Sequence, residues 1–159
     1  PVDSYKRPAS TIRRVYTPNT RTYTTSYAHN EAGQLTQLTH PSGLAIAVSH
    51  DSTGRLSGLQ NASTQSNYLS SISYNVASQV TGDTLGTGVT EQFGYDAARM
   101  QLTSQKAGTS SPYTNRMNLT YSYSATSGQM GVGSTAGNAG QLMSIGGTIN
   151  STTESASYT

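Results

Sequence analysis

The histidines and carboxylates are the residues whose chemistry could form a metal or catalytic site. His29, His40 and His50 are 11 and 10 residues apart, which matches no standard ligand spacing of zinc sites, and the chain has no cysteine. The carboxylates lie singly along the chain, at Asp3, Glu31, Asp51, Asp83, Glu91, Asp96 and Glu154. Glycoside hydrolysis needs two such groups about 5–10 Å apart, and the spacing indicates no such pair. We interpret Asp51 and Asp96 as turn residues, and we expect no metal or cofactor.

Nucleophilic and phosphate-binding motifs are incomplete. A Ser-His-Asp set can be imagined among 24 serines, but no Gly-x-Ser-x-Gly elbow is present. The segment 131–137 reads Gly-Val-Gly-Ser-Thr-Ala-Gly. It lacks the lysine, the preceding apolar strand and the following helix of a phosphate-binding loop, so we interpret it as a flexible loop. The sequence therefore predicts a protein that is not an enzyme.

The composition limits the elements that could position any functional residue. Charged residues make up 10% of the 159 positions, far below the roughly 25% of an average soluble domain, which argues against a coiled coil or a helical bundle. A net charge of +2 is too small for nucleic-acid binding, and the longest apolar run, residues 44–48, is too short to span a membrane. The 24 threonines and 11 tyrosines favour half-buried strands and indicate a folded β-protein rather than disorder.

Large and small residues alternate in several segments, which predicts strands. Between residues 117 and 123, Met117, Leu119, Tyr121 and Tyr123 alternate with small polar residues. Similar alternation occurs at 44–48, 68–74 and 89–95. Clusters typical of turns separate these runs, at residues 40–43, 52–54, 82–83, 85–88 and 108–112. Many short strands at near-regular spacing predict an all-β fold.

The predicted strand-turn-strand units form an internal repeat. Units start near residues 2, 27, 50, 74, 95 and 121, and the clearest turn reads His-Asp-Ser-Thr-Gly-Arg-Leu at 50–56. In each unit an aromatic residue would pack on the next unit, Asp or Asn would bind turn amides, and Gly would take the left-handed conformation. Such a unit cannot bury its face alone. We expect one array of five or six repeats over residues 1–159, with a glycine-rich loop insertion at 127–140, cut from a longer chain.

This repeat resembles the YD repeat of the Rhs family, which reads Tyr-Asp-x-x-Gly-Arg-Leu. The match is closest at 50–56 and at 95–102. It departs from the family pattern where Ser78 and Ala98 stand at glycine positions and where glutamine replaces arginine, at residues 34, 79 and 141. The resemblance assigns a structural signature role to Tyr27, Gly33, Leu35, Asp51, Gly54, Arg55, Leu56, Tyr74, Tyr95, Asp96, Leu102, Tyr121, Gly140 and Leu142.

The resemblance also implies a fold and a function. In bacterial polymorphic toxins, insecticidal toxin complexes and teneurins, the repeats wind a spiralling β-sheet into a hollow shell, which in the toxins encloses a C-terminal effector. For this chain it implies a structural segment of a secreted or cell-surface protein. Its partners would be neighbouring repeats of the same or identical chains and an enclosed polypeptide cargo. The family's self-cleaving core region has no counterpart in this sequence, so self-cleavage and toxicity are not assigned.

Two other hypotheses follow from the sequence. An open repeat has unpaired edges at both ends, so the chain would polymerise head to tail into an extracellular filament. Alternatively, exposed tyrosine, asparagine, serine and threonine would suit the binding of glycans or a cell surface. The basic stretch at residues 6–14, flanked by Tyr5 and Tyr16, would contact an anionic partner or, as charge on an edge strand, discourage pairing between sheets.

Overall fold

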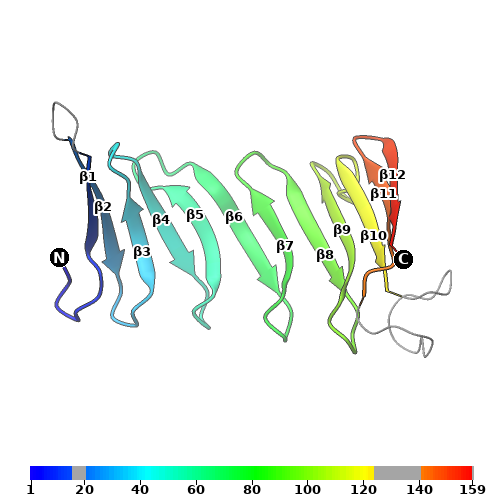
Figure 1. Cartoon of the computed structure of the whole chain (residues 1–159), viewed down its shortest axis with the longest axis horizontal. Coiled ribbons are helices and arrows are strands. Elements are labelled where there is room, and N and C mark those ends of the chain that lie inside the picture. Colours follow the sequence, from blue (N-terminus) through cyan, green and yellow to red (C-terminus); the bar gives the residue numbers. More distant parts are fainter. Residues whose placement is uncertain (16–20, 124–140, 159) are drawn as a thin grey trace. The chain divides into compact units, whose positions relative to one another are not determined.

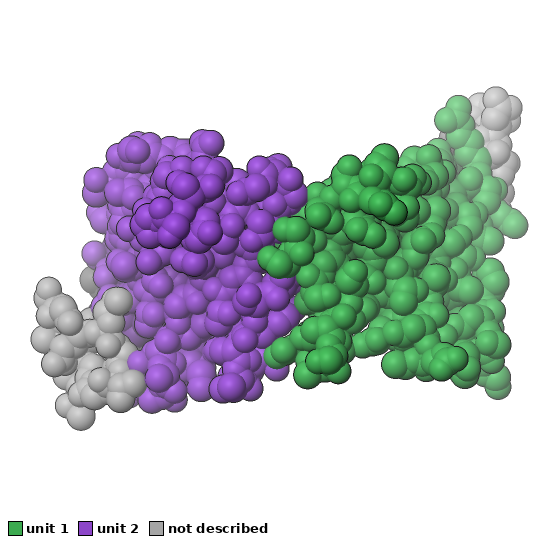
Figure 2. Space-filling model, turned by 180° about the vertical axis from the view of Figure 1, so that it is seen from behind, with its two compact units in different colours: residues 1–71 green, residues 72–159 purple. Residues whose placement is uncertain are grey.

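The computed structural model of the chain describes residues 1–15, 21–123 and 141–158. These residues form twelve strands and no helix, and therefore no helix that could cross a membrane. The chain divides into two compact units, Pro1–Ser71 and Ile72–Thr159, which are green and purple in Figure 2. The predicted all-β fold of strand-turn-strand repeats is confirmed.

Unit 1 is an antiparallel meander in which each strand pairs with the next strand in sequence (Figure 1). β1, the first strand in this order, carries the predicted basic residues Arg13 and Arg14, whereas Tyr16 lies outside the described residues. The strands of this unit are β1 (Ser10–Val15), β2 (Arg21–His29), β3 (Leu35–Thr39), β4 (Ala45–His50), β5 (Leu56–Asn61) and the first part of β6 (Asn67–Tyr74).

Unit 2 repeats the same meander, and its strand pairings are also antiparallel. The alternating segment at 117–123 forms one of these strands, and that at 89–95 forms another. The predicted loop insertion at 127–140 lies outside the described residues. The strands that follow β6 are β7 (Val80–Leu85), β8 (Thr90–Tyr95), β9 (Leu102–Gly108), β10 (Met117–Ser122), β11 (Ser144–Ile149) and β12 (Thr152–Ser157).

The meander places every second turn at the same edge of a sheet, because consecutive antiparallel strands reverse direction. In unit 1 the turn 3–7 precedes β1, and the turns 30–34 and 51–55 follow β2 and β4. These three signature turns therefore lie at one edge, which we call the turn edge, and the turn 40–44 lies at the other. In unit 2 the signature turns 75–79 and 96–101 follow β6 and β8 and likewise share an edge.

Neither unit contains a conventional hydrophobic core. Among the described residues Ala107 is the one buried apolar side chain, at 7% exposure, and no side chain is less than 2% exposed. Most domains bury one sheet face against a second layer, but the strands here keep their apolar side chains half-buried. Backbone pairing and contacts between turns must therefore supply a larger share of the stability than they do in a layered domain.

Candidate functional site: the signature turns and their cross-links

Four of the five signature turns, 3–7, 30–34, 51–55 and 75–79, share one backbone geometry. In the turn 30–34, the Gly33 amide donates to the Asn30 carbonyl (3.0 Å) and the Asn30 amide donates to the Gln34 carbonyl (3.0 Å). The turn 51–55 repeats both bonds, at 3.0 and 2.8 Å. This is a three-residue hairpin loop, in which a type I turn is followed by a left-handed residue. Gly33 and Gly54 occupy that position with φ of 83° and 88°, as the sequence predicts.

Three signature turns place a residue other than glycine in the left-handed position. Lys6 and Ser78 have φ of 61° and 62°, a conformation that costs an L-residue roughly 1–2 kcal/mol. The turn 96–101 has one extra residue, because the Asp96 amide donates to the carbonyl of Gln101 (2.8 Å). Its left-handed residue is Met100, with φ of 57°. The sequence alignment placed Ala98 at the glycine position of this turn, and the structure shows that Met100, two residues later, occupies it.

The first residue of each signature turn accepts hydrogen bonds from the turn's own amides. Asp51 Oδ1 accepts from the amides of Thr53 and Arg55, both at 2.9 Å. Asn75 Oδ1 accepts from the amides of Ala77 and Gln79, both at 3.0 Å. Short polar side chains stabilise turns in this way, so the role predicted for Asp or Asn is borne out by these contacts.

The same side chain also pairs with the residue four positions later, and the two residue types change together. Aspartate forms an ion pair with arginine, whereas the side-chain amide of asparagine donates a hydrogen bond to the side-chain oxygen of glutamine. A carboxylate can only accept and an amide can do both, so each combination is chemically matched. Gln34 and Gln79, which replace arginine, therefore leave the turn geometry unchanged. The four pairs are Asp3–Arg7 (2.7 Å), Asp51–Arg55 (2.8 Å), Asn30–Gln34 (2.6 Å) and Asn75–Gln79 (2.9 Å).

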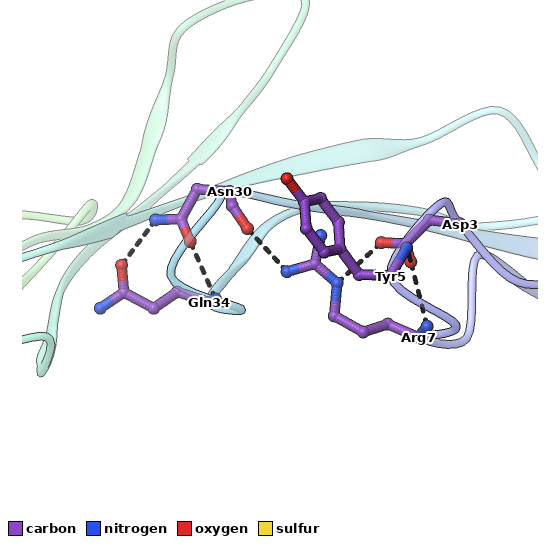
Figure 3. Close-up of polar contacts among 5 residues, drawn as sticks. All are labelled: Asp3, Tyr5, Arg7, Asn30 and Gln34. Atoms are coloured by element: carbon purple, nitrogen blue, oxygen red, sulfur yellow. Dashed lines mark hydrogen bonds and ion pairs between the residues drawn. The ribbon is translucent and has the colours of Figure 1, made fainter.

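The last residue of a signature turn also reaches the next signature turn. Figure 3 shows the Arg7 guanidinium between its own Asp3 and the following turn, where Nη1 donates to the Asn30 carbonyl at 2.6 Å. Tyr5 lies against the same guanidinium, with 4.9 Å between Cζ and the ring centroid, a cation–π distance. Arg7 thus links its own turn to a residue 23 positions later in the chain.

Two glutamines occupy equivalent positions. Gln79 Nε2 donates to the carbonyl of Met100 at 2.8 Å, and Met100 is the left-handed residue of the next turn. Gln34 Nε2 lies over Gly54, where an added Cβ would come within 2.7 Å of it. A glycine at this position therefore provides both the left-handed conformation and the space for the preceding turn's side chain. We call these side chains, Arg7, Gln34 and Gln79, the turn ladder.

Three signature hairpins close with a bulge that pairs a leading residue with the signature leucine. His50 pairs with Leu56, and Tyr95 pairs with Leu102. In the second repeat the residue paired with Leu35 is His29. Tyr27 lies two residues earlier and pairs with Leu38. The structural alignment therefore places His29, and not Tyr27, at the leading position of that repeat.

The remaining predicted signature residues lie in or beside strands. Tyr74 ends β6, immediately before the turn 75–79. The hydroxyl of Tyr95 donates to the carbonyl of Val80 (2.9 Å), and that of Tyr121 donates to Gln105 Oε1 (2.9 Å). Leu142 precedes β11, and Gly140 is outside the described residues. Asp96 is the most buried polar residue described, at 8% exposure.

Hydrogen bonding controls the ionisation of the turn carboxylates. A bond from the Thr53 hydroxyl (2.7 Å) and one from the Arg55 amide hold the pKa of Asp51 far below its ordinary value of 3.8. Partial desolvation raises the pKa of Asp3, but bonds from the Arg7 amide and guanidinium outweigh it, so that this pKa is also lowered. Both carboxylates therefore act as permanent anions in their turns at neutral pH.

One carboxylate pair was missed by the sequence analysis. Asp83 on β7 lies directly opposite Glu91 on β8, and Asp83 Oδ1 is buried with no hydrogen-bond partner among the residues that the structure describes. Desolvation raises the pKa of both groups, and the charge of Asp83 raises that of Glu91 further. The sequence feature that could have revealed this pair is the turn at 85–89. Asp83 lies two residues before it and Glu91 two residues after it, so a hairpin around this turn places them opposite each other. In the described part of the chain no three His, Asp or Glu side chains gather closely enough to hold a metal ion.

Comparison with known proteins finds similarity in structure. No family model and no curated protein sequence matches the chain. The crystal structure of TcdB2-TccC3-TEV matches 91% of the chain with a TM-score of 0.72 and 18% identity, and the complex TcdB2-TccC3-Cdc42 gives the same values. A Tc holotoxin pore from Photorhabdus luminescens matches 78% of the chain with a TM-score of 0.60 and 22% identity.

These similarities cover a small part of much larger proteins. The chain spans 7% of the TcdB2-TccC3-TEV chain and 5% of the holotoxin chain. At 18–22% identity the likeness shows the fold, and it supports the family resemblance carried by the signature turns. The chain therefore has the fold of a segment of an Rhs/YD-repeat shell protein.

Proposed function

We propose that this chain is a non-enzymatic wall segment of an Rhs-type shell, which encloses or presents a polypeptide cargo in a secreted or cell-surface protein. The observation that carries the proposal is the turn ladder. It holds successive hairpins side by side at one edge of a sheet, where no second layer of the described residues packs on the strands.

A shell wall needs such edge contacts for a physical reason. A layered domain fixes the spacing of its strands by packing side chains into a core, whereas a wall must leave one face toward a lumen and the other toward solvent. Cross-links between neighbouring turns hold the hairpins in position without a core. The hydroxyl-rich strands, such as β2 and β12, tolerate water on both faces.

The TcdB2-TccC3 structures supply the analogy for cargo. They share the fold of this chain over 91% of its length, and the repeats of toxins in this family surround an effector. By this analogy the partners of the chain are neighbouring repeats and an enclosed polypeptide. The analogy favours an extracellular destination, because the related Tc proteins are toxins.

Electron cryomicroscopy of the intact polypeptide that carries these residues tests the proposal. We expect the hairpins to stack along a wall, with one sheet face toward a lumen that contains polypeptide density. Limited proteolysis provides a second measurement, because cargo inside a closed wall is protected until the wall is opened by denaturant. Sheet faces covered by an ordinary second layer, or cargo cleaved at the same rate in the native and denatured protein, would overturn it.

A further inference from the structure

A groove on unit 1 has no role in the turn ladder. It has a volume of about 650 Å³ and is lined by β1, β2 and the turn 40–44, through Thr11, Arg13, Tyr23, Thr25, His40 and Pro41. The strand register brings these side chains to one face, because Arg13 lies opposite Tyr23 and Thr11 lies opposite Thr25. The volume lies within the range of small-ligand sites, about 300–1,000 Å³.

The charge around this groove is positive. Arg13 forms no ion pair with any described residue. Residues 10–15, 21–29 and 35–50 contain three arginines and no carboxylate. The carboxylates closest in sequence, Asp3, Glu31 and Asp51, belong to turns at the turn edge, which is the opposite edge of the sheet from the turn 40–44. An anionic group in the groove would therefore meet the Arg13 guanidinium without competition.

The other lining groups suit a ligand with hydroxyls and a flat apolar face. Tyr23 is 40% exposed, so its ring is accessible beside the guanidinium. The hydroxyls of Thr11 and Thr25 have no hydrogen-bond partner among the described residues. His40 Nδ1 lies 2.9 Å from the Ser42 hydroxyl and 3.3 Å from the Ser42 amide, which leaves Nε2 of the ring for a bond to a ligand hydroxyl.

We propose that this groove binds an acidic saccharide. A uronic-acid carboxylate pairs with the Arg13 guanidinium, whose planar fork matches carboxylate geometry. The sugar ring lies on the face of Tyr23, and the sugar hydroxyls bond to the two threonines and to His40. Arg13 is the one cation among the lining residues of the groove, and Arg21, opposite Val15, is the other arginine on this sheet face. Two cations with hydroxyl groups beside them fit one carboxylate on a polyhydroxyl ligand better than they fit a nucleic acid or an anionic membrane, which are held by larger clusters of basic residues. This binding is independent of the shell function.

Binding of a hyaluronan hexasaccharide to the whole chain, followed by isothermal titration calorimetry and by NMR, tests the proposal. We expect saturable binding that Arg13→Gln and Tyr23→Ala each weaken by about tenfold or more, as for loss of a charge-assisted contact. Arg14 is the matched control, since it lies on the same strand, opposite Thr22 and on the other sheet face. Arg14→Gln removes the same charge and should change the affinity by less than about twofold.

The carboxyl-reduced hexasaccharide distinguishes the proposed contact from general sugar binding, and we expect it not to bind. Circular dichroism of each variant confirms that the strands are intact. The proposal is overturned if the hexasaccharide does not bind, if its reduced form binds equally well, or if both arginine variants weaken binding to the same extent. The last result would indicate a nonspecific attraction of polyanions to the basic end of unit 1.

Discussion

The turn ladder makes a quantitative prediction at Asn75 and Gln79. Asn75 accepts two turn amides at 3.0 Å and donates to the Gln79 side chain at 2.9 Å. Gln79 in turn donates to the carbonyl of Met100, in the next turn, at 2.8 Å. Replacing either residue by alanine removes its own bonds and the one that the two share, so the two substitutions should not be additive.

The expected free energies follow from counting these bonds. An exposed hydrogen bond contributes on the order of 0.5–1 kcal/mol net. Asn75→Ala loses three bonds and should lower the free energy of unfolding by about 2 kcal/mol, whereas Gln79→Ala loses two and should lower it by about 1 kcal/mol. The double variant loses four bonds, because the shared bond is lost once, and should be about 0.5 kcal/mol less destabilised than the sum of the single variants.

Urea unfolding and amide hydrogen exchange provide the measurements. Far-UV circular dichroism and tyrosine fluorescence must give coincident transitions before a two-state free energy is extracted. Hydrogen exchange then locates the effect. Asn75→Ala should reduce protection in its own turn, and Gln79→Ala should also reduce it in the turn 96–101. Val76 is the matched control, since it lies in the same turn and is fully exposed, and Val76→Ala should change the stability by less than about 0.5 kcal/mol.

Two results would refute this reasoning. Strict additivity of Asn75→Ala and Gln79→Ala would show that their shared bond contributes nothing. Unchanged exchange in the turn 96–101 upon Gln79→Ala would show that the bond to Met100 does not connect the two turns energetically. In that case the signature turns would be independent hairpin loops, and the turn ladder would not hold the wall together.

Three further predictions concern other turns and the carboxylate pair. Ser78→Gly should raise the free energy of unfolding by about 1 kcal/mol, because φ of 62° suits glycine, and urea unfolding that shows no gain would contradict this. Asp51→Asn alone should lower the melting temperature in calorimetry, and adding Arg55→Gln should recover most of the loss by recreating the Asn–Gln turn. Because burial raises the pKa values of Asp83 and Glu91, protonation of these two groups stabilises the folded protein. This stabilisation is complete below the ordinary pKa values of 3.8 and 4.5 and is lost as the pH rises through the raised values. Asp83→Asn should therefore stabilise the protein at pH 7 and reduce the gain that the unmodified protein shows on acidification from neutral pH toward the ordinary aspartate pKa of 3.8, and an unchanged pH profile would exclude the effect.

Much of the fold could be predicted because strands and turns depend on neighbouring residues. Alternation at residues 117–123 reports a strand directly, since side chains alternate across the sheet at every residue. The turn 51–55 is equally local, because an aspartate that binds amides two and four residues ahead needs no distant partner. The same logic failed at 96–101. The expected position, Ala98, is two residues after Asp96, whereas the left-handed residue is three after the first in the turn 51–55 and four after it, at Met100, in this longer turn. Only the backbone bonds could reveal this.

The sequence by itself determined the all-β fold, the repeat and the chemistry within the regular signature turns, because alternation along a strand and hydrogen bonding within a turn depend on residues a few positions apart. Only the tertiary structure decided which turns touch. The Arg7–Asn30 and Gln79–Met100 contacts join residues 23 and 21 positions apart, and the Asp83–Glu91 pair depends on the register that the hairpin turn at 85–89 sets. A shift of one residue in register exchanges the two faces of a strand. The groove at Arg13 and Tyr23 exists for the same reason, because pairing of β1 with β2 in this register places both side chains on one face.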